Sequence, residues 1–504
     1  MPSELHASRA AGRVWAAVRE GGRTVELHVE PDGQRALAPG RIVKGRVSRV
    51  LPGIQAAFVD IGESRDAFVH VSDVPVPGAL PIRRLPRAWE ALDPEEHSSD
   101  PPPPATLGGA ARIEDVVREG TEIVVQIVRG PVQSKGPRAS GYPSLAGRGL
   151  VYFPTVDVRA VSRRIADPDE RERLRGVVAG IPVEGGLVAR TAAEGVSEDR
   201  LAAEAHGLAA AWAAIAERAR AEPAPVVLRR EPDVLERLLR DAPAGGYERV
   251  VVDDRELEAR ALELLPTLAA GGVVTVERRA SGEVFRDLAQ QVDQALAPRV
   301  HLPSGGDLVI EPTEALVSVD VNTARHVGTA GGRDTVLTTN LEAAGEIGVQ
   351  LRLRDLAGSI AVDFIDMSSE AARARVIEAL EQALRGDRAR TRITPLAEGG
   401  LVHVARERRR QPLFASVTRA CPSCRGTGRV ASAEIVAERA RREIERLAAA
   451  LEAECVVLRA HPEVVAAFRR LYLKEGTAVS EAPYRVEVVE DGAVDRGDYE
   501  LEAS

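Results

Sequence analysis

Short runs in which apolar and polar residues alternate dominate the first part of the chain. They are TVELHVE, RIVKGRVSRVL, QAAFVDIG and DAFVHVSDV, all within residues 24–75. Strands of this length and spacing are typical of a small β-barrel. Residues 76–112 then turn to proline, alanine and charge, which indicates a surface insertion. Strand signals resume at EIVVQIV.

Helical spacing of apolar residues appears farther along. The stretch DRLAAEAHGLAAAWAAIAERARAE, near residues 196–241, predicts an amphipathic helix. After Gly245 the runs YERVVVDD, RELEARALELL and GGVVTVERR alternate between strand and helix, which indicates an α/β layer. That alternation continues over residues 296–395, and residues 431–452 predict a charged helix before a last α/β stretch. We therefore expect an α/β multidomain protein, since 504 residues are too many for one core.

Composition narrows the class further. Hydrophobic residues make up 44% and charged residues 28%, and no apolar run has the length of a membrane span, so we expect a soluble protein. The chain has only three cysteines and no apolar leader at its N-terminus, so we expect a cytoplasmic protein. The net charge of −9 argues against indiscriminate nucleic-acid binding, so a nucleic-acid surface would have to be local.

Two stretches carry acids in a strand context. As a strand, EALVSVDVNTARHVG places Asp320 and Asn322 on one face and three valines on the other. In GSIAVDFIDMSSEAARARVIEALEQAL, a strand buried on both faces holds Asp363 in its middle, and a helix capped near Ser368 or Ser369 follows. A buried carboxylate needs a cation or several donors. Two acids on neighbouring strands beside an amide suit Mg²⁺. A pair of hydrogen-bonded structural aspartates is the alternative.

A second candidate site lies in QAAFVDIGESRDAFVH. Phe58 and Phe68 occur there beside Arg65, downstream of Lys44 and Arg46. Aromatic faces with basic neighbours on a small barrel are how OB-type folds stack single-stranded bases. The alternative is that both rings belong to the barrel core. The basic loop QSKGPRAS, residues 133–140, either holds phosphate or is an ordinary turn.

The stretch RACPSCRGTGRV carries half of a zinc site. Cys421 and Cys424 have the spacing of two thiolate ligands, and no second pair exists in the chain. Cys455 lacks a partner. A two-fold axis would bring the same pair from a second chain and complete four ligands. A redox CxxC and a coincidental pair of thiols are the alternatives, although Gly426 and Gly428 oppose the helix that a redox motif needs. Residues 403–430 form a local basic patch, with seven arginines against one glutamate.

Several long stretches together resemble the ribonuclease E/G family, from about residue 37 to beyond 430. They are KGRVSRVLPGIQAAFVDIG, LVARTAAEGV, LPSGGDLVIEPTEALVSVDVNTA, TTNLEAAGEIGVQLRLRDLAGSIAVDFIDM and CPSCRGTG. Because the chain ends soon after the cysteine segment, we expect the member type that lacks a long disordered tail.

The resemblance implies a function. It implies magnesium-dependent endonucleolytic cleavage of single-stranded RNA in rRNA maturation and mRNA decay, leaving a 5′-phosphate on the downstream product. By position, Asp320 and Asp363 are similar to the metal-binding acids, and Asn322 to the amide that orients Asp320 or the scissile phosphate. Phe58, Phe68 and Lys135 match the family's RNA-binding barrel. A pocket that prefers a 5′-monophosphate corresponds to Gly147, Val151, Arg163, Arg190, Thr191 and Arg390.

The resemblance also implies an architecture. Residues 1–36 and 222–295 would form an RNase H-like subdomain, 37–128 an OB-type RNA-binding domain with the insertion 76–112, and 129–221 the 5′-sensor. Residues 296–413 would be a DNase I-like catalytic subdomain, 414–430 a zinc link and 431–504 a small C-terminal domain. Relatives assemble as homodimers through a shared Zn²⁺, sometimes paired into tetramers.

Two departures and two alternative functions accompany the resemblance. Ala324 stands where the family usually has glycine, and His403 where relatives commonly carry glutamate. Both departures leave the expected ligands intact and bear on substrate positioning. The alternatives are a non-catalytic RNA-binding scaffold of the same fold, and a redox or zinc-sensing scaffold built on Cys421 and Cys424.

Overall fold

A computed structural model resolves the chain into two compact units, Met1–Ser416 and Val417–Ser504. The structure describes residues 2–32, 39–75, 112–130, 136–162, 164–243, 245–268, 274–323, 332–395, 400–424, 426–473 and 484–504. Four sets of residues singled out in the sequence lie outside these ranges: the predicted insertion apart from Arg112, and Lys135, Arg163 and Ala324. The expectations about these residues stay predictions.

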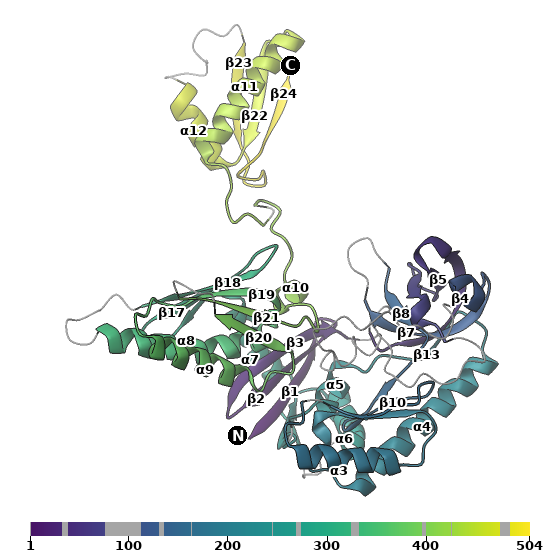
Figure 1. The fold of residues 1–504 in the computed structure, drawn as a ribbon. Helices are drawn as coiled ribbons and strands as arrows, with labels where there is room; N and C mark the ends of the chain where they lie inside the picture. Colours follow the sequence, from purple (N-terminus) through teal and green to yellow (C-terminus); the bar gives the residue numbers. More distant parts are fainter. Residues whose placement is uncertain are drawn as a thin grey trace. The chain divides into compact units, whose positions relative to one another are not determined.

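A five-stranded sheet joins the start of the chain to a later segment (Figure 1). Its order is β3-β2-β1-β14-β15, antiparallel from β1 to β3 and parallel from β1 to β15. The strands are β1 Ser3–Ala10, β2 Arg13–Glu20, β3 Arg23–Pro31, β14 Arg249–Val252 and β15 Thr275–Arg278. TVELHVE is therefore wrong as a barrel strand, since it forms β3 and continues the β1–β2 hairpin.

Helices cover both faces of this sheet. Leu5 and Val250 pack with residues of α5 Val234–Arg240 and α6 Arg255–Leu268 in one buried cluster. On the opposite face, Trp15 of β2 packs edge-to-face on Phe285 of α7 Glu283–Leu296, with ring centroids 5.3 Å apart.

A closed five-strand barrel follows, with the ring order β4-β5-β6-β8-β7 and β7 pairing back to β4. Its strands are β4 Ile42–Leu51, β5 Ala56–Asp60, β6 Ala67–His70, β7 Glu122–Arg129 and β8 Arg138–Ser140. Alternate side chains such as Val47, Val59 and Val69 fill the interior. The barrel is confirmed and is consistent with an OB-type fold. A further strand, β13 Val226–Arg229, pairs with β4 from outside the ring.

A four-stranded sheet lies next along the chain, in the order β11-β12-β10-β9. Its elements are β9 Leu145–Ala146, β10 Leu150–Phe153, β11 Arg159–Val161, β12 Gly186–Ala189, α3 Pro168–Gly180 and α4 Glu198–Ala221. The helix predicted from the alanine-rich stretch is α4, and its Leu201 packs against Leu150 and Leu187 of the sheet.

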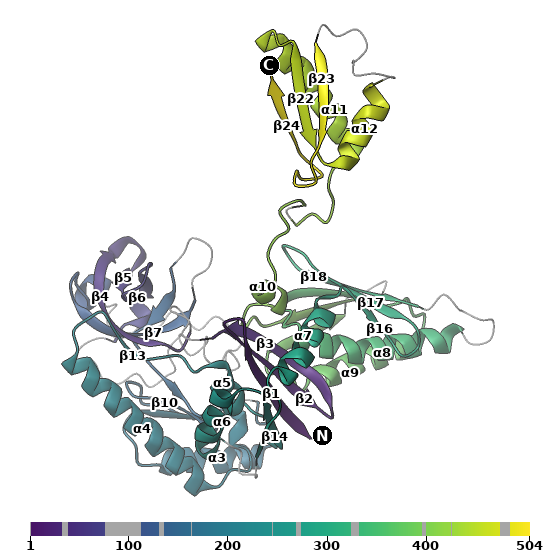
Figure 2. The same ribbon diagram turned by 180° about the vertical axis from the view of Figure 1, so that it is seen from behind.

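The largest sheet of the later half has six strands in the order β16-β17-β18-β19-β21-β20. Its elements are β16 Arg299–His301, β17 Asp307–Pro312, β18 Val317–Asn322, β19 Gly358–Asp363, β20 Thr391–Pro395, β21 Leu401–Arg406, α8 Gly332–Leu353 and α9 Glu370–Leu384. Both views show the two helices lying together along the sheet (Figures 1 and 2). Apolar residues of all six strands and both helices form one core on that face. Ser369 caps α9 by accepting from the N–H of Ala372, as predicted.

The second unit is a small α/β domain. Its sheet has the order β23-β22-β24, and its elements are α11 Ala433–Leu451, β22 Cys455–Ala460, α12 Pro462–Tyr472, β23 Arg485–Glu490 and β24 Tyr499–Ala503. Phe468 and Ile444 pack against Leu458 in its core. The short helix α10 Leu413–Val417 precedes this unit. Within the described ranges, no helix is long and apolar enough to cross a membrane.

Candidate active site

The two acids singled out in the sequence lie side by side on adjacent strands. β18 and β19 are parallel, and their register pairs Asp320 directly with Asp363. Neighbouring strands are about 4.8 Å apart, so the two carboxylates share one small region of the sheet surface. Val319 and Val362 beside them point to the helix-covered face and are buried. The alternation predicted for β18 is confirmed, and both acids lie on the face opposite α8 and α9.

Asn322 lies on the same face and contacts the carboxylates of Asp320 and Asp307. Its Nδ2 donates to Asp320 Oδ2 at 2.9 Å and lies 3.4 Å from Asp307 Oδ1. Asp307 also accepts from Arg299 at 2.6 Å. The amide therefore fixes one oxygen of Asp320 and leaves Asp320 Oδ1 for another partner.

The backbone that follows Asp363 is fixed by a buried amide. Asn340 of α8 is fully buried, donates to the carbonyl of Ile365 at 2.8 Å, and accepts from its N–H at 3.1 Å. Gly400 approaches from the other side with a φ of 74°, and a Cβ there would lie 2.5 Å from the Phe364 carbonyl oxygen. These contacts hold the end of β19 from two sides, so the position of Asp363 is set by helix and strand together.

The predicted burial of Asp363 is wrong. Residues of β19 alternate between a buried and a less buried face, and Asp363 ends the strand in an exposed position. Among the described residues, no helix lies over one face of the sheet, so β19 buries its side chains on the other face only. Exposure removes the desolvation cost that argued for a cation, but it leaves the carboxylate accessible to a ligand.

A polar depression of about 390 Å³ lies over the two acids. Asp366 lines it together with Asp320, Asn322 and Asp363. Sequence reasoning missed Asp366, although its position three residues after Asp363 in the run DFID was visible. With three acids and an amide around one depression, the local potential is strongly negative and attracts cations.

The donor set fits a hard divalent cation that keeps most of its water. Mg²⁺ is usually held by one or two carboxylates plus waters and substrate phosphate oxygens. Asp320 and Asp363 are two such carboxylates in register on neighbouring strands. In the described part of the chain, no group of three or more His, Cys, Asp or Glu side chains is arranged as a metal cage. The arrangement therefore suits a cation shared with a substrate rather than one enclosed by protein.

The two barrel phenylalanines lie on the outside of the barrel. Their strands pair Phe58 with Phe68, and the rings meet edge-to-face with centroids 6.0 Å apart. Both are half-buried, and their neighbours Val59 and Val69 fill the core instead. The alternative that these rings form the core is wrong. Arg49 pairs with Phe58 and Arg138 with Phe68, so two exposed arginines flank the aromatic pair. Arg138 also contacts the buried Asp73 at 2.8 Å, which compensates its charge.

Lys44 and Arg46 contribute less positive charge to that surface than the sequence suggested. Both contact Glu122, at 2.7 Å and 2.9 Å, and they lower the pKa of this carboxyl to about 2. Arg65 is exposed on the loop between β5 and β6.

The predicted 5′-sensor residues divide into a cluster and a separate position. Arg190 Nη1 donates to the carbonyl of Gly147 at 2.7 Å, and its Nη2 contacts Asp241 at 3.0 Å. Burial raises the pKa of Asp241, but Arg240 and Arg190 outweigh burial and hold this pKa well below its usual value. The structure thus brings Gly147 and Arg190 together.

The remaining sensor residues have different surroundings. Thr191 follows Arg190, with its hydroxyl 3.5 Å from that of Ser162. Val151 is buried within a small apolar cluster, so its side chain is not available to a ligand. Arg390 is exposed immediately before β20. A side-chain hydrogen bond joins its segment to the four-stranded sheet that contains β11, because Arg164 Nη2 donates to the carbonyl of Arg388 at 3.2 Å.

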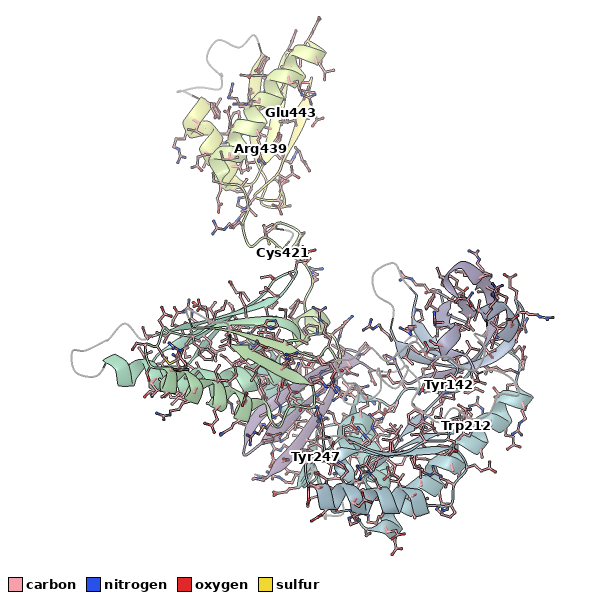
Figure 3. The ribbon with its side chains drawn as sticks, viewed as in Figure 1. Tyr142, Trp212, Tyr247, Cys421, Arg439 and Glu443 are labelled. Carbon is pink, nitrogen blue, oxygen red and sulfur yellow. The ribbon has the colours of Figure 1, made fainter. Side chains whose placement is uncertain are left out.

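Cys421 and Cys424 lie in the segment between α10 and α11, where Figure 3 labels Cys421. Backbone N–H groups of Cys424 and Ser423 lower the pKa of the Cys421 thiol, which favours the thiolate. Gly426 and Gly428 have φ values of 93° and 68°, so no helix continues from the pair. This geometry opposes the redox alternative, which needs a helix directly after the pair.

The basic patch predicted over residues 403–430 is partly confirmed: Arg408, Arg409, Arg419 and Arg429 are exposed, whereas other arginines of the segment are used in internal contacts. Arg406 is buried, and Arg410 contacts Asp355 at 2.6 Å and His28. Arg409 donates to the carbonyl of Arg388 at 2.7 Å. These arginines hold the segment to the rest of its unit.

Comparison with known proteins gives one consistent answer. The model of the ribonuclease E/G family matches residues 144–409. Ribonuclease G of Escherichia coli is 37% identical over 474 residues, covering 93% of each chain. Ribonuclease G of Haemophilus influenzae is 36% identical over 453 residues, 89% of this chain and 88% of that protein. Ribonuclease E of a Nostoc species is 38% identical over 398 residues, 77% of this chain and 54% of that protein. The chain therefore belongs to the ribonuclease E/G family.

Proposed function

We propose that this protein is a magnesium-dependent endoribonuclease that cleaves single-stranded RNA, with a preference for 5′-monophosphorylated substrates, in rRNA maturation and mRNA decay. Family membership supports the endoribonuclease class. The observation that carries the site assignment is the register of β18 and β19, which pairs Asp320 with Asp363 beneath an open polar depression.

The residues of this site have distinct tasks in the proposal. Asp320 and Asp363 would hold Mg²⁺, and Asn322 keeps Asp320 oriented through the 2.9 Å hydrogen bond. Bound there, Mg²⁺ supplies activation of water and compensation of phosphate charge. The open face admits an extended RNA strand, and Asn340 keeps the end of β19 in place while the strand binds.

RNA binding and 5′-end sensing are assigned to two other surfaces. Phe58 and Phe68, with Arg49 beside Phe58, present aromatic edges and positive charge to single-stranded bases and phosphates. Arg190, with Thr191 beside it, supplies the charged fork and hydroxyl that a terminal phosphate requires. Val151 would take part through packing, since its side chain is buried.

The proposed assembly is a cytoplasmic homodimer linked by Zn²⁺. Cys421 and Cys424 provide two thiolates, and the same pair of a second chain would complete four. Replacing both with serine should release zinc and yield monomers in analytical ultracentrifugation. A variant that stays dimeric, from a wild type that contains no zinc, would contradict the link.

The decisive experiment is a cleavage time course on one short single-stranded RNA carrying either a 5′-monophosphate or a 5′-triphosphate. Wild type with Mg²⁺ should cut the monophosphorylated RNA faster, and Asp363→Asn should cut neither RNA while still binding both. EDTA should stop cleavage but not binding. If wild type binds both RNAs and cuts neither under any metal condition, the protein is a non-catalytic scaffold.

A further inference from the structure

The uncovered face of the six-stranded sheet extends well beyond the acid pair. Strand pairing places residues in rows across it, because partners in register share a face. One row contains Asp320 and Asp363, and Asp363 pairs onward with Leu401. The next row contains Ala361, His403 and Thr394.

A third row contains Ser359, Ala405 and Arg392. Ile393, between Arg392 and Thr394, packs against the core on the helix-covered side. Arg392 and Thr394 therefore project on the open face, and both are exposed.

The side chains of these rows are suited to phosphate. His403 Nε2 lies 2.8 Å from Ser359 Oγ, which fixes the ring on the open face and leaves Nδ1 turned away from that serine. Within the described ranges, Arg392 has no hydrogen-bond or ion-pair partner. An exposed arginine without an ion-pair partner offers its planar fork of donors to a polyanion.

Sheet geometry sets the distances from the acids. With a rise of about 3.3 Å per residue and strands about 4.8 Å apart, the Cα of His403 lies about 8 Å from that of Asp363, and Arg392 about 16 Å. The rows thus lead from the acid pair to β20, the edge strand of the sheet.

At that edge the path meets the predicted sensor. Arg390 precedes Arg392 by two residues and is exposed. Two residues before it, Arg388 accepts the hydrogen bond from Arg164, which follows β11 of the sensor sheet. The segment before β20 is therefore linked by a hydrogen bond to the residues that follow β11, which pairs with β12 just ahead of Arg190.

We propose that His403 and Arg392 bind the RNA backbone on this surface, with Ser359 as a positioning residue, so that the nucleotides between the 5′ end and the cleaved bond run across β21 and β20. This inference rests on the proposed function and names the residues that hold the upstream part of the substrate.

The test uses the full-length protein and a 5′-monophosphorylated RNA with one cleavage position. Arg392→Gln should raise KM about fivefold with kcat little changed, because an exposed ionic contact contributes at most about that factor. It should also reduce the slope of log(kcat/KM) against log[salt] by about 0.7, the value for one phosphate contact on a single strand. His403→Gln should raise KM by a similar or smaller factor through the loss of a hydrogen bond to phosphate. Arg375→Gln removes the same charge from α9 on the covered side of the sheet and serves as the matched control.

Substrate truncation gives the second readout. Removing nucleotides upstream of the cleaved bond should raise KM for wild type, because the contact with Arg392 is lost. Arg392→Gln lacks this contact already, so truncation should raise its KM less. Removing downstream nucleotides should affect both proteins equally. Ser359→Ala should reproduce part of the His403→Gln effect on KM.

The outcomes separate the two proposals. If wild type cleaves but His403→Gln and Arg392→Gln behave like Arg375→Gln in KM, and Arg392→Gln also in salt slope, the path is overturned and the endoribonuclease assignment stands. If wild type itself never cleaves, the proposed function fails. The proposed RNA path is then tested by the dissociation constants for RNA of the same variants, which should exceed those of wild type and Arg375→Gln.

Discussion

Arg406 and Asp320 belong to the same six-stranded sheet and use their charges in opposite ways. Arg406 is 4% exposed and contacts Asp387 at 2.6 Å and Asp355 at 2.8 Å. Asp320 is exposed and accepts a hydrogen bond from Asn322 at 2.9 Å. A buried charge must be compensated inside the protein, whereas an exposed one is free for a ligand. The comparison therefore predicts that the burial of a charged group separates structural from functional roles in this sheet better than its residue type.

The strongest test of this contrast is the loss of an exposed acid. Asp363→Asn should lower kcat by about 10³-fold or more, because losing several kcal/mol of metal-dependent stabilisation has that effect. The free energy of unfolding, measured by urea denaturation, should hardly change, since Asp363 ends β19 in an exposed position. A variant that unfolds more readily would show that the acid pair is structural.

Removing a buried charge should do the reverse. Arg406→Met leaves Asp355 and Asp387 without this cation and should cost about 3–5 kcal/mol of unfolding free energy. Arg299→Met is the control on the same sheet, because Arg299 is 55% exposed and its pair with Asp307 should contribute about 1 kcal/mol or less. Equal losses in the two variants would contradict the comparison.

Asn340 connects the two kinds of region. Asn340→Ala removes both hydrogen bonds to Ile365 and should cost about 1–3 kcal/mol in unfolding free energy. Because the end of β19 loses its anchor, kcat should fall while KM for RNA stays nearly constant. An unchanged kcat in the folded variant would mean that Gly400 alone positions Asp363.

The smallest expected effect is a pH dependence of stability at His28. Burial lowers the pKa of His28 to about 4, Arg410 adds to the shift, and Glu26 opposes it. Since the unfolded chain takes up the proton near pH 6.5, stability is full above that pH and falls as pH drops toward 4. Between pH 7 and 5.5 the unfolding free energy should fall by about 1 kcal/mol.

His28→Gln is the control for that titration. The variant should flatten the dependence between pH 7 and 5.5. Glu26 should lower the unfolding free energy only at more acidic pH. Its pKa in the folded protein lies well below 4.5, so its stabilising effect is full above the pKa of the unfolded chain and is lost as the pH falls below that value. A variant as pH-sensitive as wild type would assign the effect to other groups.

Local sequence was enough for the elements that depend on periodicity. The faces of β18, the cap of α9 at Ser369 and the family itself were predicted and are confirmed. Tertiary context decided the errors. Nothing in GSIAVD reveals that one face of β19 has no helix above it, and TVELHVE carries no signal of which sheet it joins. The ion pairs of Arg406 and Arg410 likewise join residues about fifty positions apart, beyond the reach of a local charge count.

The site residues divide in the same way. The register of Asp320 with Asp363 agrees with the strand assignment, whereas Asp366 and Asn340 needed the fold to be noticed. The roles of all these residues stay predictions until cleavage is measured.

The parallel pairing of β18 and β19 also bears on how the protein is made. Asp320 and Asp363 come from strands separated by the crossover that contains α8, and parallel strands cannot pair until such a crossover has formed. A chain still emerging from the ribosome holds the first acid without the second, and β19 then needs β21 beside it to complete the sheet. Because domains fold as units during synthesis, the proposed site at Asp320 and Asp363 should form only after nearly the whole first unit has been translated.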